Sequence, residues 1–117
     1  MILQIETRQL GGDVTVLVFT GRITIGRESQ RIETMVNELV AQDRKKLIFD
    51  LSGVEYIDST GIGIIAFTSA TLNQAGGGLR VSGARGKVEH VFEAMRLANI
   101  VPCYPNVDAA LKAFEPA

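Results

Sequence analysis

The chain has 117 residues, of which 46% are hydrophobic and 21% are charged, a composition typical of a globular domain rather than of a disordered segment. Twelve Lys and Arg residues against thirteen Asp and Glu residues leave a net charge of −1, which excludes binding to nucleic acid or anionic membranes through bulk charge. The one cysteine, Cys103, cannot form an internal disulfide, and no apolar run approaches the roughly 20 residues that span a bilayer. The N-terminus also lacks the features of a signal peptide. We therefore expect one cytoplasmic domain over residues 1–117, without membrane insertion.

The first half of the chain predicts a hairpin, a helix and a buried strand. Residues 2–10 alternate apolar and polar side chains and, after a glycine turn, residues 14–19 are again strand-like, which predicts a β-hairpin. The segment 20–27 breaks this pattern and predicts a loop. Residues 28–42 predict an amphipathic helix, and the continuous apolar run 46–51 predicts an interior strand. The inward side chains of that helix are Ile32, Met35, Val36, Leu39 and Val40.

The second half repeats the alternation of helix and strand. Residues 62–73 have the length of a helix that ends at the glycine run 76–78, and residues 79–82 predict a short strand. Residues 87–97 predict a second amphipathic helix, and residues 100–104, bracketed by prolines, predict an edge strand. The inward side chains of the second amphipathic helix are Val88, Val91, Phe92 and Met95.

A final helix is predicted after Asn106, whose side chain can cap its first turn. The inward side chains of this helix are Val107, Ala110, Leu111 and Phe114.

Strands that alternate with helices predict an α/β fold: a mixed, mostly parallel sheet with an N-terminal hairpin and about four helices. The loops after the parallel strands then gather at the carboxyl edge of the sheet, where ligands and partners usually bind. These loops are residues 20–27, 52–59, 82–87 and 102–106. Ser59 lies in the middle of the edge, and the neighbouring loops carry Arg22, Arg27, Arg85 and Lys87.

Ser59 belongs to the stretch 54–63, which connects a predicted strand to a predicted helix. A serine at such a junction can cap the helix by accepting from a free N–H group of its first turn, and Asp58 can cap the same turn or orient the Ser59 hydroxyl. The same position suits phosphate, because the start of a helix carries partial positive charge and unpaired donors. A third role, as a nucleophile, is also open at this point.

Enzymatic chemistry has little support in the sequence. The nucleophile elbow G-x-S-x-G requires glycine two residues before the serine, where this chain has Ile57, and the only histidine, His90, falls on the polar side of its helix. One His, one Cys and scattered carboxylates show no metal-ligand spacing, and we expect Cys103 to be a buried packing residue. Gly61 and Gly63 are interpreted as points of close helix packing rather than as a dinucleotide motif. We expect no enzyme activity and no cofactor.

The segment Asp58-Ser59-Thr60-Gly61-Ile62-Gly63, preceded by an apolar strand and followed by a helix, a glycine run and a strand, resembles the STAS family. More narrowly it resembles the stand-alone bacterial anti-sigma-factor antagonists. The resemblance implies that Ser59, rather than Thr60, is phosphorylated by a serine kinase that is also the anti-sigma factor. It further implies a phosphatase that reverses the modification, and control of transcription through release of a sigma factor.

The expected partner-binding surface combines the resemblance with the predicted edge. Its residues are Arg22, Ile23, Thr24, Asp58, Ser59, Thr60, Gly61, Ile62 and Arg85. Many phosphorylated members read roughly G-E-L-D where this chain reads Gly21-Arg22-Ile23-Thr24, a departure that bears on which partner is recognised. The alternative is a STAS scaffold or sensor module that binds a nucleotide or another anion on the same edge. A hydrolase that uses Ser59 is a third and weaker hypothesis.

Overall fold

The computed structural model describes residues 3–11, 13–24 and 26–114. Its strands are β1 (Gln4–Gln9), β2 (Val14–Ile23), β3 (Lys46–Ile57), β4 (Gly78–Ser82) and β5 (Cys103–Tyr104). Its helices are α1 (Arg27–Ala41), α2 (Ser59–Gln74), α3 (Gly86–Ala94) and α4 (Val107–Lys112), with a short 3-10 turn, η1 (Leu97–Asn99), after α3. Parts of two predicted elements, at residues 2 and 25, lie outside the described residues.

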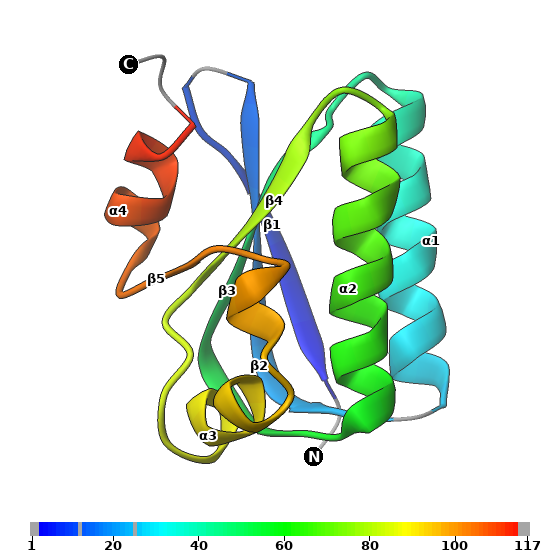
Figure 1. Ribbon diagram of the computed structural model, residues 1–117. Helices are drawn as coiled ribbons and strands as arrows, with labels where there is room; N and C mark the ends of the chain where they lie inside the picture. The colour runs from blue at the N-terminus through cyan, green and yellow to red at the C-terminus, as the bar shows by residue number, and fades with distance from the viewer. Residues whose placement is uncertain (1–2, 12, 25, 115–117) are drawn as a thin grey trace.

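The five strands form one sheet in the order β1-β2-β3-β4-β5 (Figure 1). β1 pairs antiparallel with β2, while the pairs β2–β3, β3–β4 and β4–β5 are parallel. The predicted hairpin and the mostly parallel sheet with four α-helices are thus confirmed. The parallel pairing brings the connections after β2, β3, β4 and β5 to one edge, as the alternation of elements requires.

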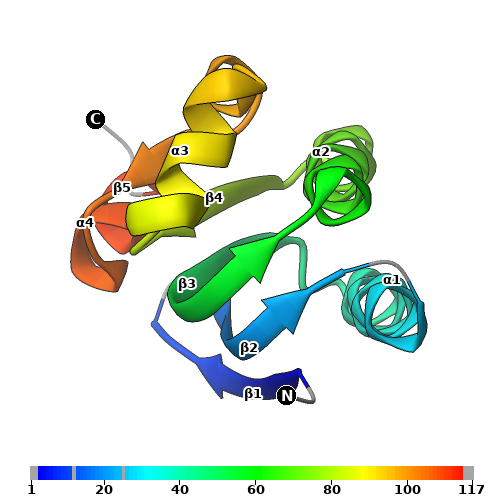
Figure 2. The ribbon, with the colours of Figure 1, turned by 90° about the horizontal axis from the view of Figure 1, so that it is seen from below.

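Helices cover both faces of the sheet unequally (Figure 2). α1 and α2 lie side by side on one face, where the larger core includes the edge-to-face pair Phe19 and Phe49, whose ring centroids are 4.9 Å apart. α4 covers the other face through a smaller cluster around Val16, Ile48 and Ala110. α3 packs against β3 with Val88 and Phe92, near the carboxyl edge.

Helical periodicity predicted the packing faces well, apart from the end of α3. Ile32, Val36 and Leu39 of α1 are buried as expected, and Asn106 caps α4 by accepting from the Ala109 N–H group at 2.9 Å. Met95, predicted to face the core, is 53% exposed. The reason is that α3 ends at Ala94, one residue earlier, and the left-handed Arg96 then turns the chain into η1.

Two strands continue well beyond their predicted ends. β2 reaches Ile23 and β3 reaches Ile57, whereas apolar patterning ended them at residues 19 and 51. The pairing of these strands shifts register between Val18 and Thr20 and again at Gly21 and Arg22, so the alternation of buried and exposed side chains breaks although the ladder continues. Residues 20–23 of the first predicted loop and 52–57 of the second are therefore strand.

The edge strand β5 is shorter than predicted and its cysteine is not a packing residue. It covers only Cys103 and Tyr104 of the predicted span 100–104, and Ile100 is 58% exposed. Cys103, expected to be buried, is an exposed residue on the last strand of the described sheet, which pairs with β4 on one side.

Two phenylalanines provide a matched test of this core. Phe49→Ala removes a fully buried ring and should lower the free energy of unfolding by about 3–5 kcal/mol. Phe67→Ala makes the same chemical change at a position that is 61% exposed and should cost about 0.5 kcal/mol or less. Urea unfolding of both variants measures the difference, and equal losses would contradict the arrangement described.

Candidate functional site

The carboxyl ends of β2 and β3 lie at the bottom of Figure 1, beside the starts of α1 and α2, and Figure 2 views the molecule from this edge. The connection from β3 to α2 is one residue, Asp58, because β3 ends at Ile57 and α2 begins at Ser59. So short a connection leaves the first turn of α2 little freedom relative to the sheet.

Asp58 joins the two elements through hydrogen bonds on both sides of the connection. Its backbone N–H donates to the carbonyl of Ile23 on β2 at 3.2 Å, and its own carbonyl accepts from the Ile62 N–H group at 3.0 Å. The Asp58 side chain accepts from the Gly61 N–H group at 2.8 Å. Asp58 is therefore the N-cap of α2, whereas the cap role considered for Ser59 is wrong, because Ser59 is the first residue inside the helix.

Gly61 lets α2 lie close against the strand ends. A Cβ atom at this position would lie 2.6 Å from a side-chain carbon of Ile57 and 2.9 Å from both the carbonyl oxygen and a side-chain carbon of Ile23. The predicted close packing is confirmed at Gly61. It is wrong at Gly63, which is exposed and whose Cβ would meet no protein atom within 4 Å.

Ser59 occupies an exposed position in the first turn of α2. The N–H groups of this turn carry the partial positive charge of the helix start, and the cap uses the N–H group of Gly61. A negative group on the Ser59 hydroxyl would thus lie at the end of the helix that favours it. Thr60, the neighbouring hydroxyl, is half-buried.

Some of the other residues predicted for the partner-binding surface are exposed, and others are buried in the core. Arg22 is exposed and Thr24 is half-buried, while Ile23 and Ile62 are 1% and 4% exposed and belong to the core below the surface. Arg85 is exposed but lies elsewhere: it lines a small hollow with Asp50 and Ser52, and its Nε donates to the Gly83 carbonyl at 3.4 Å.

Tyr56 is a site residue that the sequence did not single out. The Arg22 guanidinium lies 4.9 Å from the centre of the Tyr56 ring, a distance typical of a cation–π contact, and Tyr56 is 38% exposed. The two residues are register partners on β2 and β3. Their strand neighbours Ile23 and Ile57 point into the core, so Arg22 and Tyr56 project on the opposite side of the strand ends.

The outer face of α2 is the second feature missed. Its exposed positions include Ser59, Gly63, Phe67 and Ala70, which recur at helical spacing and form one stripe, here called the α2 outer stripe. No residue of α2 is charged, and Phe67 is 61% exposed. Surface helices ordinarily place charged residues toward water, so an uncharged exposed stripe indicates a contact surface. The absence of charge from residues 59–74 was the signal available in the sequence.

The described residues give little support for a Ser–His catalytic pair, a metal site or a membrane span. His90 is exposed on α3, as predicted, and it comes from a different helix than Ser59. Within the described ranges, no three His, Cys, Asp or Glu side chains gather in a way that could hold a metal ion. No helix among them is long and apolar enough to cross a membrane.

Known proteins share both the sequence pattern and the fold. The STAS domain family matches residues 4–110. An anti-sigma F factor antagonist of Paenibacillus polymyxa is 26% identical over 116 residues, which cover 98% of this chain and 97% of the relative. The crystal structure of an anti-sigma factor antagonist from Mycobacterium paratuberculosis superposes with a TM-score of 0.84 at 27% identity, covering 96% and 93% of the two chains. The phosphorylated form of SpoIIAA from Bacillus superposes with a TM-score of 0.74 at 13% identity, over 96% and 100%.

The two glycines of α2 allow a paired test of this geometry. Gly61→Ala should lower the free energy of unfolding by about 1–3 kcal/mol, because the new methyl group meets the backbone of β2. Gly63→Ala should raise it by about 0.5–1 kcal/mol, because alanine favours the helix and has room.

Thermal and urea unfolding of the two variants give the comparison. A stabilised Gly61→Ala protein would contradict the described approach of α2 to the strand ends.

Proposed function

The chain belongs to the STAS domain family, and we propose that it is an anti-sigma-factor antagonist whose binding to a serine-kinase anti-sigma factor is abolished by phosphorylation of Ser59. In this proposal the protein is a regulatory binding partner rather than an enzyme, and it acts in the cytoplasm. Its free form sequesters the anti-sigma factor, so that a sigma factor is released and transcription changes.

The observation that carries the proposal is the place of Ser59 at the start of the α2 outer stripe. Ser59, Gly63 and Phe67 are four residues apart in turn and lie on one exposed, uncharged face. A partner that covers this face removes Ser59 from water along with Phe67. The hydroxyl of an unmodified serine tolerates such burial far better than a phosphate does.

Phosphorylation changes the interface and leaves the fold in place. It adds roughly −1.5 to −2 charge and three acceptor oxygens at Ser59. Within the chain this charge lies at the start of α2, where the N–H groups of the first turn carry partial positive charge that favours it. Against a partner surface that matches the uncharged stripe, the same charge must be desolvated, which costs enough to remove binding.

The remaining site residues take supporting roles in this proposal. Arg22 and Tyr56 form a cationic and aromatic flank at the strand ends, suited to an acidic or apolar group of the partner. Asp58 and Thr60 adjoin the serine in the chain, and Thr24 follows Ile23, whose carbonyl accepts from the Asp58 N–H group. Ile23, Gly61 and Ile62 support the surface from beneath. Arg85, which lines a separate hollow, is the outermost candidate.

The relatives support the proposal at two levels. The Paenibacillus polymyxa relative, similar over nearly the whole chain, is an anti-sigma F factor antagonist. SpoIIAA of Bacillus has the same fold in a phosphorylated form, which supports the view that this fold accommodates a phosphate.

The switch predicts a specific pattern of modification. With ATP and the serine kinases encoded near its gene, wild-type protein should acquire one phosphate, on the peptide that contains Ser59. Ser59→Ala should remain unmodified, whereas Thr60→Ala, the matched neighbouring hydroxyl, should be phosphorylated like the wild type. Mass spectrometry of the peptides reads the result. Phosphate on Thr60, or on none of the three proteins with any of these kinases, would contradict the switch.

The α2 outer stripe predicts where the partner binds. Phe67→Ala should weaken binding to the kinase by about 1–2 kcal/mol, or roughly five- to thirtyfold, because it removes the largest exposed apolar side chain of the stripe. Met95→Ala, which truncates an apolar side chain of similar exposure on the far side of α3, should bind as the wild type does.

Isothermal titration of each variant with the kinase measures the change in Kd. If the two substitutions changed the Kd equally, the α2 outer stripe would not be part of the interface. This conclusion would hold whether or not Ser59 is phosphorylated.

A further inference from the structure

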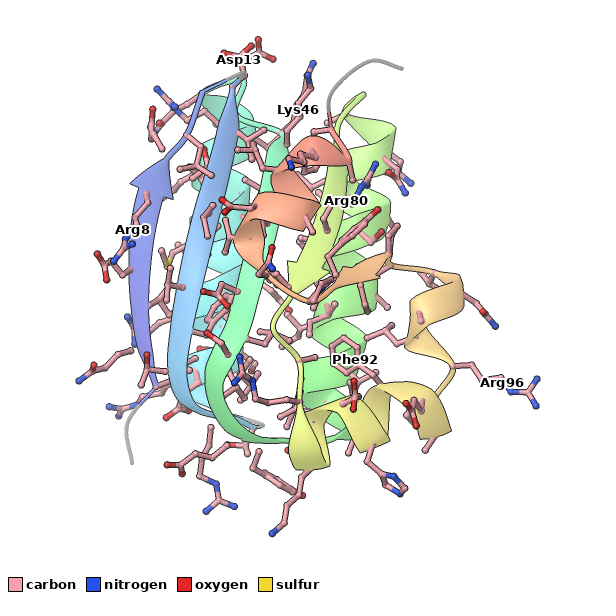
Figure 3. All side chains as sticks on the ribbon, turned by 90° about the vertical axis from the view of Figure 1, so that its left-hand side faces the viewer. Arg8, Asp13, Lys46, Arg80, Phe92 and Arg96 are labelled. Atoms are coloured by element: carbon pink, nitrogen blue, oxygen red, sulfur yellow. The ribbon has the colours of Figure 1, made fainter. Side chains whose placement is uncertain are left out.

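A hollow of about 350 Å³ lies away from Ser59, between α3, η1 and β5. In Figure 3 the Phe92 side chain points from α3 into the space beside β5. Phe92 is 3% exposed and belongs to the core, while Tyr104 contributes a half-buried ring from the edge strand. Ala84 adds a small apolar side chain from the loop before α3. The hollow therefore has an apolar floor and a volume at the lower end of small-molecule sites, which begin at about 300 Å³.

The wall on the α3 side carries two carboxylates. Glu89 and Glu93 are four residues apart on one helix, and both line the hollow. Like charges at this spacing repel each other and weaken a helix. The ion pairs found among the described residues join Arg8 with Glu6 and Lys45 with Asp43, and no Lys, Arg or His lines this hollow. A cation placed in the hollow would relieve the repulsion.

Cys103, on β5, also lines the hollow. The thiol donates to the Val101 carbonyl at 3.4 Å, and burial raises its pKa above the ordinary value, although the residue as a whole is exposed. Its side chain is thus turned toward protein, and it lines the same space as the two carboxylates. An occupant of the hollow would cover the thiol.

We propose that this hollow binds a small organic ammonium ion, whose apolar body packs on Phe92 and Tyr104 and whose charged nitrogen meets Glu89 and Glu93. A charged donor on a carboxylate forms the stronger class of hydrogen bond, and the two rings supply the apolar contact. The site is distinct from the Ser59 surface, so its occupancy does not depend on the function proposed above.

The single cysteine makes the proposal testable in the full chain. Benzylammonium serves as the probe, with benzyl alcohol as its neutral analogue and benzoate as its anionic one, at matched ionic strength. The rate at which iodoacetamide alkylates Cys103 is measured against the concentration of each compound. Benzylammonium should slow the reaction in a saturable way, by about fivefold at four times its Kd, because only the unoccupied fraction reacts. Benzyl alcohol and benzoate should protect far less.

Two double variants assign the effect to the carboxylates. Glu89→Gln with Glu93→Gln should weaken protection by benzylammonium at least about tenfold in Kd, since the charged partners are lost. Glu33→Gln with Glu38→Gln, which removes two exposed carboxylates of α1, should leave it unchanged. Both variants should stay folded, and the Glu89 and Glu93 double variant should melt at or slightly above the wild-type temperature, because the repulsion between the two charges is removed.

Three results would overturn the proposal: no protection of wild-type Cys103 by benzylammonium, equal protection by benzyl alcohol, or equal protection in the Glu89 and Glu93 double variant.

Discussion

The one-residue connection between β3 and α2 is the constraint on which the site depends. Asp58 bonds to β2 through its N–H group and caps α2 with its carboxylate, so the start of the helix is held against the ends of two strands. The missing side chain of Gly61 allows the helix to approach Ile23 and Ile57 closely. The result is that the first helical residue, Ser59, has a defined and exposed place at the carboxyl edge.

This geometry separates the requirements of folding from those of binding. The inward side of the junction, with Gly61 and Ile62, contributes to the core, while the outward side carries Ser59 and continues along the uncharged α2 outer stripe to Phe67. In the proposed switch, a charge added at Ser59 acts on whatever covers the stripe and leaves the packing beneath it unchanged. That division explains how one modification can switch an interaction of a domain whose stability comes from elsewhere.

Most of the fold could be predicted from patterns of apolar side chains, because the helices are amphipathic and the inner strands are continuous. The ends of β2 and β3 could not, since two shifts in register disrupt the alternation from which a strand is recognised. Of the two residues that the sequence allowed as the cap of α2, the structure confirms Asp58, while Ser59 falls inside the helix. Phe67 was overlooked because a helix without charged residues has the sequence of one that is buried on all sides. Only the structure shows which face of α2 is exposed. Met95 left the predicted face because α3 ends before it.

The central claim is that a phosphate on Ser59 removes binding without disturbing the fold. The most direct measurement compares phosphorylated and unphosphorylated wild-type protein in two ways: the Kd for the anti-sigma factor and the amide spectrum of the core strands β2 and β3. The account predicts that phosphorylation weakens binding at least about 100-fold, while shifts in the spectrum stay within the first turns of α2 and the adjacent strand ends. Unchanged affinity, or a loss of affinity accompanied by changes throughout the sheet, would contradict it.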